Sequence, residues 1–125
     1  MNTTQAHMQK ALKRLHVAQK LLQDNEYEDA VSRAYYAMYH AAKAALATVN
    51  TYPKTHEGII KEFGKKLILT GTFPKELGKN LANTKAARET YEYTTTTTPN
   101  KTETEKTVHN AQTFVKTIQQ YLEQE

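Results

Sequence analysis

The amino-acid sequence predicts an all-α fold: an up-down antiparallel bundle of four long helices and one shorter helix, organised as a single domain over residues 1–125. Three observations support this prediction. Apolar residues recur at three- and four-residue spacing along most of the chain, whereas no segment alternates as a strand would. The segment 31–49 is apolar or small on nearly all sides, which is typical of a helix at the centre of a bundle. A chain of 125 residues is long enough for one core but not for two.

The first two helices are predicted to be antiparallel neighbours joined by a short turn. The first helix spans about residues 3–23 and carries a stripe of apolar residues at helical spacing. Asp24 and Asn25 interrupt this pattern. We expect Asn25 to cap the central helix together with Glu28, three residues later. The central helix then continues to about Asn50, before Pro53.

A short third helix is predicted to follow the central one. It begins at about Thr55, and Gly71 is expected to end it in a left-handed conformation. Pro74 suits the first turn of a fourth helix. In that helix Arg88 and Glu92 have the four-residue spacing of an ion pair.

The last helix is predicted to follow a run of five threonines, residues 94–98. A β-branched run of this kind has no helical period, so we interpret it as a loop. The helix begins near Pro99 or Thr102, the latter with Glu105 in the spacing of a capping box. We expect this helix to pack against the first two.

The charge is unevenly distributed along the chain. The formal net charge is +4 at pH 7, but residues 54–88 contain eight Lys or Arg and only three Glu. Such a basic segment can attract phosphates through its electrostatic field. A solvated, lysine-rich helix face would have the same composition, so the charge alone leaves both interpretations open.

The composition argues against several kinds of chemistry. Without cysteine, the chain forms no disulfide, zinc-thiolate site or thiol nucleophile. Ser32 is the only serine and lacks the glycine-flanked turn of a hydrolase nucleophile. The five histidines show no metal-binding spacing, and aspartate occurs only at positions 24 and 29, so we expect neither a metal ion nor a cofactor. No apolar run is long enough to cross a bilayer and no signal peptide opens the chain, which predicts a cytoplasmic protein.

Arg33 and His40 are the candidate catalytic residues. They lie two turns apart on one stripe of the central helix, roughly 10 Å along its axis. An imidazole can take a proton from an RNA 2′-hydroxyl or give one to the leaving 5′-oxygen, and a guanidinium can hold the phosphate, all without a metal. The same stripe carries Ala37, Ala44 and Ala47. A twofold dimer that packs these alanines together would bring two copies of each candidate residue to one cleft.

A structural role for both residues is the alternative. Arg33 could pair with a carboxylate such as Asp29, one turn earlier, or with a glutamate of the fourth helix. His40 could form a hydrogen bond with a tyrosine. Tyr35 and Tyr39 are predicted to lie in the core.

Three further residues are predicted to bind nucleic acid or a nucleotide: Tyr36, Lys43 and Arg88. Tyr36 lies nearer the Arg33 stripe than the other two tyrosines of its helix, and its ring could stack on a base. His56, beside a predicted helix start, is interpreted as a local structural residue.

The sequence resembles the HEPN domain family, in particular its small stand-alone prokaryotic members. The resemblance rests on three segments, which together represent most of the chain: SRAYYAMYHAA at 32–42, KTHEGIIKEFG at 54–64 and RETYEY at 88–93. It implies a homodimeric helical bundle that is either a ribonuclease toxin with an arginine and a histidine four to six residues apart, or a relative that partners a minimal nucleotidyltransferase. Arg33 and His40, with six residues between them, meet the outer limit of that motif.

Two positions depart from the pattern of the toxins. Ala34 stands where a polar residue usually follows the arginine, and Ala42 stands where many toxins have the tyrosine that a partner transferase modifies. The resulting prediction is an RNA- or nucleotide-binding component of a toxin–antitoxin or defence module, acting as a metal-independent endoribonuclease. The alternative is a non-catalytic interaction domain that partners a minimal nucleotidyltransferase.

Overall fold

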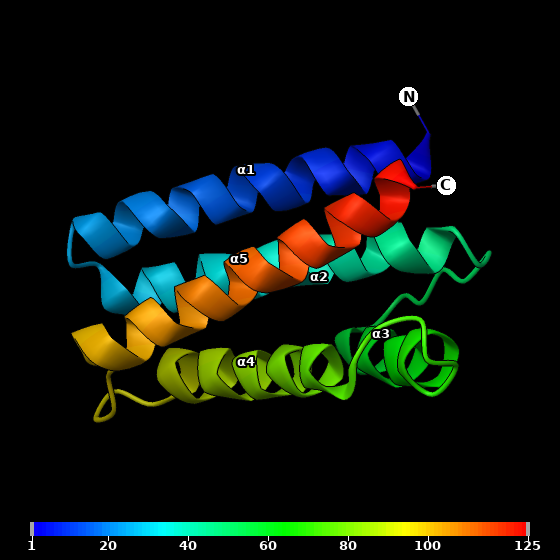
Figure 1. Cartoon of the computed structure of the whole chain (residues 1–125). Helices are drawn as coiled ribbons and strands as arrows, with labels where there is room; N and C mark the ends of the chain where they lie inside the picture. Colours follow the sequence, from blue (N-terminus) through cyan, green and yellow to red (C-terminus); the bar gives the residue numbers. More distant parts are fainter. Residues whose placement is uncertain (1, 125) are drawn as a thin grey trace.

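The computed structural model describes residues 2–124, which form five α-helices and a single π-helical turn, with no strand among them. No helix in this range is long and apolar enough to span a membrane. The elements, in chain order, are α1 (Thr3–Gln23), α2 (Tyr27–Ala47), α3 (His56–Phe63), η1 (Gly64–Ile68), α4 (Lys75–Tyr93) and α5 (Lys101–Glu123) (Figure 1).

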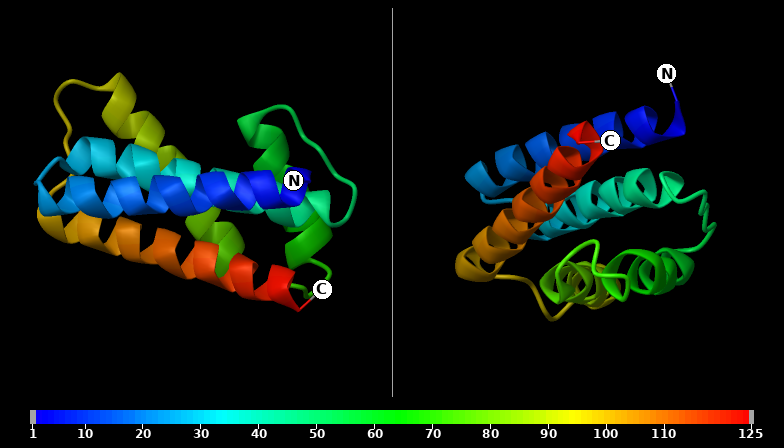
Figure 2. Two further views of the ribbon diagram at one scale, coloured as in Figure 1. Left: turned by 90° about the horizontal axis from the view of Figure 1, so that it is seen from above. Right: turned by 45° about the vertical axis from the view of Figure 1, so that its right-hand side comes forward.

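Helix α2 lies at the centre of the bundle. Helices α1 and α5 cover one side of it, and α3 and α4 cover the other, as Figures 1 and 2 show. Twelve of the 21 residues of α2 are buried, which is why its sequence is apolar or small on nearly all sides. The prediction of a helical bundle with four long helices and one short helix is therefore confirmed.

The alanines of α2 let α1 approach closely. Ala37 and Ala44 have no exposed surface within a single chain, and neither do Ala11 and Ala18 of α1. The contact between α1 and α2 is the most extensive of any helix pair among the described residues. The expectation that the alanine stripe joins two copies of the chain was therefore wrong, because the chain's own helices already cover it.

Aromatic rings fill the core where α3, α5 and the segment before α4 meet. The ring centroids of Phe63 and Phe114 are 5.3 Å apart, and those of Phe63 and Phe73 are 5.8 Å apart. Phe63 and Phe114 are fully buried. This cluster fixes the position of the short α3 against the long helices.

The helix ends follow the sequence signals in part. Gly71 has a left-handed φ of 81°, as predicted. Helix α3 begins close to the predicted Thr55, which caps it by accepting a hydrogen bond from the Gly58 backbone N–H. Residues 94–98 form a loop, as predicted.

Two predicted caps were wrong. Asn25 has a left-handed φ of 61° and belongs to the turn, so α2 begins after Glu26 without a side-chain cap. The capping box of α5 uses Asn100 and Glu103 in place of Thr102 and Glu105.

Candidate functional site

One face of α2 is not covered by the rest of the bundle. Along it, five half-buried polar or aromatic side chains recur at three- and four-residue spacing, here called the α2 strip: Ser32, Tyr36, Tyr39, His40 and Lys43. Residues of α1 flank the strip on one side, and residues of α3 and α4 flank it on the other. The strip is therefore where side chains from four helices can meet a ligand.

A pair of histidines forms the α1 side of this site. The Nδ1 atoms of His7, on α1, and His40, on α2, lie 3.1 Å apart, within hydrogen-bond distance. Their rings meet through these nitrogens, with centroids 5.3 Å apart and planes inclined by 22°. The partner of His40 is thus a histidine, and the prediction of a tyrosine partner was wrong.

The two histidines lie in a positively charged surrounding. Burial, together with the smaller effects of His7, Lys10, Arg14 and Lys43, lowers the pKa of His40 to about 4. Burial, followed by the charges of Lys43 and Lys10, also lowers the pKa of His7. Both imidazoles are therefore neutral at pH 7, and neutral imidazoles can accept a proton while the neighbouring cations attract a phosphate.

The low pKa of His40 predicts that stability depends on pH. Its pKa is about 4 in the folded chain, against 6.5 for an accessible imidazole, so the unfolded chain takes up this proton first as the pH falls. We expect His40 to contribute nothing to this dependence above pH 7 and to lower the free energy of unfolding progressively from pH 6.5 to pH 4. The free energy of unfolding can be measured with urea at pH 7 and at pH 4.5. It should fall more between these pH values for wild type than for the His40→Gln variant. An equal fall for both proteins would contradict the prediction.

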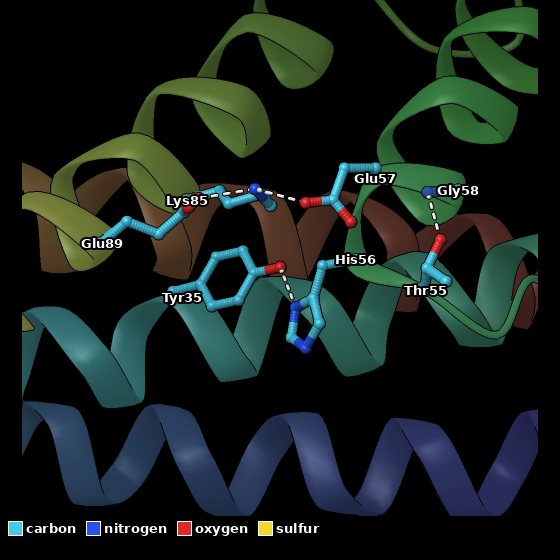
Figure 3. Close-up of polar contacts among 7 residues, drawn as sticks. All are labelled: Tyr35, Thr55, His56, Glu57, Gly58, Lys85 and Glu89. Atoms are coloured by element: carbon cyan, nitrogen blue, oxygen red, sulfur yellow. Dashed lines mark hydrogen bonds and ion pairs between the residues drawn. The ribbon is translucent and has the colours of Figure 1, made fainter.

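A second cluster, on the α3 and α4 side, joins tyrosines to a histidine. The hydroxyl of Tyr35 lies 2.7 Å from Nδ1 of His56, at the start of α3, as Figure 3 shows. The ring of His56 stacks on that of Tyr39 with centroids 4.7 Å apart. Burial, followed by the charges of Arg88 and Lys85, lowers the pKa of His56. His56 therefore lies in one cluster with Tyr35 and Tyr39, and its contacts are of the structural kind that the sequence analysis expected.

The positively charged guanidinium of Arg88, on α4, packs against the tyrosines of the same cluster. Its guanidinium carbon lies 4.9 Å from the centroid of the Tyr36 ring and 5.5 Å from that of Tyr35. The predicted ion pair with Glu92 is confirmed, at 2.9 Å. The Nε atom of Arg88 is buried and has no hydrogen-bond partner among the described residues.

A network of charges joins α3 to α4 beside these rings. Lys85 lies between Glu89, one turn later on α4, and Glu57 of α3, at 3.4 Å (Figure 3). Lys85 is itself mostly buried, whereas Glu57 is exposed. The network positions the start of α3, and with it His56, against α4.

Loss of the Tyr35 hydroxyl should weaken the fold modestly. Tyr35 is 1% exposed, and burial raises its pKa, so its hydroxyl stays protonated and can donate to His56. We expect Tyr35→Phe to lower the free energy of unfolding by about 1 kcal/mol, because one hydrogen bond is lost while the half-buried His56 can turn to water. Urea unfolding measures this, with Tyr93→Phe, at a position that is 76% exposed, as the control. A change no larger than that of the control would contradict the assignment.

The structure brings most of the predicted site residues together. Tyr39 connects the two clusters, since its ring centroid lies 5.1 Å from that of His40, and Nζ of Lys43 lies 5.3 Å from it. Tyr39 was predicted to be a core residue, but it is half-buried and lies between the clusters. The prediction that Tyr35 is in the core is confirmed.

Arg33 lies apart from this group. It is exposed, and the ion pairs among residues 2–124 do not include it, so the expected pair with Asp29 is absent there. It is also missing from the charges that most affect the pKa of His40. Within one chain, the cations beside His40 are those of α1 and Lys43.

His7 and His56 were not predicted as site residues. His7 is 33 positions from His40, and His56 is 21 positions from Tyr35, so no spacing within one helix links either pair. Only the packing of α1 and α3 against α2 brings them together. Among residues 2–124, no three His, Asp or Glu side chains are placed to bind one metal ion.

A separate groove lies on another part of the bundle. It has a volume of about 740 Å³ and runs between α4 and α5, over Val31 of α2. Half of its lining residues carry amide or hydroxyl side chains, among them Asn80, Asn110 and Thr84. None of the predicted site residues lines it, and it holds no comparable cluster of neutral imidazoles and cations.

The fold is that of a small helical-bundle domain, and its central helix carries a polar strip that includes a histidine. The chain belongs to the HEPN domain family, whose model matches residues 4–121.

Two relatives come from Methanocaldococcus jannaschii. One, named "Putative toxin MJ0605", is 37% identical over 120 residues, covering 96% of this chain and 89% of the relative. The other, named "Putative toxin MJ0142", is 34% identical over 115 residues, covering 92% of this chain and 78% of the relative. A third relative, "UPF0332 protein PH1297" from Pyrococcus horikoshii, is 34% identical over 80 residues, covering 64% of this chain and 56% of the relative.

Proposed function

We propose that this chain is a toxin of a toxin–antitoxin module and that it cleaves RNA without a metal ion. The observation that carries the proposal is the half-buried His40, a neutral imidazole surrounded by cations on the strip of α2 that the bundle leaves open. The names of the two relatives from Methanocaldococcus jannaschii support the toxin class.

The proposed reaction uses the 2′-hydroxyl of RNA as the nucleophile. His40 takes the proton from this hydroxyl, and the 2′-oxygen attacks the adjacent phosphorus while the 5′-oxygen leaves. Positive charge near the phosphate stabilises the negative charge that develops on its oxygens. Lys10, Arg14 and Lys43 supply that charge within one chain.

RNA binding is proposed to extend along the strip to the tyrosine cluster. The face of Tyr36 and the guanidinium of Arg88 are within cation–π distance, and both are of the kind that recognises single-stranded bases and phosphates. Single-stranded RNA is the substrate class that fits such a surface, because its bases are free to stack.

Arg33 is proposed to act from a second copy of the chain. It is exposed and lies two turns from His40 on the same helix, so it would reach the phosphate at His40 across a twofold interface. The covered alanines take no part in the proposed contact, which leaves the α2 strip open to RNA. The expected mass in solution is twice the 14.3 kDa of one chain.

The test is cleavage of a mixed single-stranded RNA by purified protein in excess EDTA, with the mass of each sample measured by light scattering. We expect wild type to cleave, and Arg33→Gln to cleave at least about tenfold more slowly, because one phosphate contact is lost. Lys116→Gln, an exposed change on α5, is the matched control and should leave the rate unchanged. Absence of cleavage by wild type would contradict the proposal and would favour the non-catalytic domain that partners a nucleotidyltransferase.

A further inference from the structure

We propose that His7 is a positioning residue for His40: Nδ1 of His7 accepts a hydrogen bond from the Nδ1–H of His40, so that Nε2 of His40 stays free to take a proton. The inference rests on the proposed function and deepens it, because it assigns the group that keeps the proposed base in its reactive form. His7 acts through His40 and does not itself exchange a proton with the RNA.

The contact between the two rings has the geometry of a hydrogen bond in the plane of the rings. The two Nδ1 atoms are 3.1 Å apart, the ring centroids are 5.3 Å apart, and the planes are inclined by only 22°. The centroid distance exceeds the nitrogen distance by about two ring radii, so both nitrogens lie close to the line between the centroids. Each Nδ1 therefore points at the other, and each Nε2 lies on an edge of its ring that faces away from the contact.

The contact holds one proton, and the position of this proton decides which nitrogens are bare. A hydrogen bond between two nitrogens needs a proton on one of them, and a neutral imidazole carries a single proton. The ring that donates through Nδ1 therefore has a bare Nε2, and the ring that accepts through Nδ1 has an Nε2–H. Only the arrangement in which His40 donates leaves His40 with a nitrogen that can take the proton of a 2′-hydroxyl.

The surrounding charges favour the arrangement in which His40 donates. Lys10, Arg14 and Lys43 are among the groups that most affect His40, whereas Lys43 and Lys10 alone are the cations in the corresponding group for His7. A bare nitrogen carries partial negative charge, and an N–H carries partial positive charge. The bare Nε2 is therefore more favourable on the ring with more cations around it, which is His40.

His7 affects the reaction through the orientation and protonation of His40. The hydrogen bond holds the imidazole in one tautomer, and it persists when Nε2 takes the proton of the 2′-hydroxyl, because the Nδ1–H of the resulting imidazolium still has an acceptor. As the 2′-oxygen bonds to phosphorus and the P–O5′ bond breaks, the 5′-oxygen takes a proton from water. The imidazolium then returns its Nε2 proton to the hydroxide that remains. Nδ1 of His40 keeps its proton throughout, so both rings end in the tautomers with which they started.

The first test is spectroscopic and does not depend on activity. Nitrogen-15 NMR spectra of the wild-type protein at pH 7.5 report which nitrogen of each imidazole carries the proton. The loss of signals in His7→Asn and in His40→Gln assigns the two rings. We expect His40 to be protonated at Nδ1 and His7 at Nε2, and a His40 ring protonated at Nε2 would overturn the proposal.

The second test compares two variants of similar shape, of which only one can accept a hydrogen bond at position 7. In the cleavage assay with EDTA, His7→Leu should lower kcat at least about tenfold while KM changes less than about twofold, because the base loses its acceptor but the RNA contacts remain. His7→Asn should stay within about threefold of wild type, since its carbonyl oxygen can accept the same hydrogen bond. His16→Leu, an exposed change on the same helix, is the control and should cleave at the wild-type rate.

The outcomes separate this inference from the proposed function. If wild type cleaves RNA and His7→Leu cleaves at the wild-type rate, the role of His7 is overturned while the function stands. The same holds if His7→Leu and His7→Asn lose kcat equally, since the acceptor at position 7 then makes no difference. If wild type does not cleave RNA, the proposed function fails and the role of His7 fails with it, whatever the tautomers are.

Discussion

Replacing His40 by alanine is expected to reduce the rate of RNA cleavage at least about 100-fold, the usual contribution of a positioned general base. The imidazole is half-buried on the open strip of α2, and its lowered pKa keeps it able to accept a proton at pH 7. Its removal also breaks the contact with His7, whose Nδ1 lies 3.1 Å from that of His40. The measurement is the single-turnover rate on a labelled single-stranded RNA in EDTA.

The fold should survive this change, which makes the loss of rate interpretable. His40 lies at the edge of the core and not within it, so the helical circular dichroism spectrum and the mass in solution of His40→Ala should match those of wild type. His16→Ala, at an exposed position of α1, should cleave at the wild-type rate. A His40→Ala protein that is folded and cleaves within about threefold of wild type would remove His40 from the mechanism.

Replacing Phe114 by alanine is expected to lower the free energy of unfolding by about 3–5 kcal/mol, because the lost ring leaves a cavity that the surrounding helices fill only in part. Phe114 is fully buried and packs against Phe63 with ring centroids 5.3 Å apart, where α5 meets the short α3. A small domain has a total stability of about 5–15 kcal/mol, so this one contact accounts for a large share. Urea unfolding followed by circular dichroism, at one protein concentration, gives the value.

The matched control is an aromatic residue that lies outside the core. Tyr93 is 76% exposed at the end of α4, so Tyr93→Ala should change the free energy of unfolding by no more than about 0.5 kcal/mol. A loss of less than about 1.5 kcal/mol for Phe114→Ala would mean that the contact between α3 and α5 is not a tightly packed part of the core.

The order of the helices could be predicted because each one carries its own pattern. The apolar stripe of residues 3–23 gave the bounds of α1 as the structure has them, and the small residues of 31–49 identified the central helix. The capping residues were harder to predict, because several polar residues near each helix start could act as the cap. Asn100 preceded Thr102 as the cap of α5, and Asn25 adopted a turn conformation that a side-chain pattern does not reveal.

The site could be predicted only where it follows one helix. His40, Tyr36 and Lys43 share one face of α2, and all three were predicted to be site residues. His7 and His56 reach the same surface from α1 and α3, and no local pattern marks a histidine whose partner is 21 or 33 positions away. Spacing also grouped Arg33 with His40, whereas in one chain the cations that most affect His40 come from α1 and from Lys43.

The measurement that tests the central claim most directly is the chemistry of the cleaved ends. Purified protein in excess EDTA would be incubated with a single-stranded RNA and with DNA of the same sequence, and the products analysed by mass spectrometry. If His40 activates the 2′-hydroxyl, only the RNA is cleaved, and the fragments carry a 2′,3′-cyclic phosphate and a 5′-hydroxyl. Cleavage of the DNA, fragments with a 5′-phosphate, or intact RNA would each contradict this mechanism.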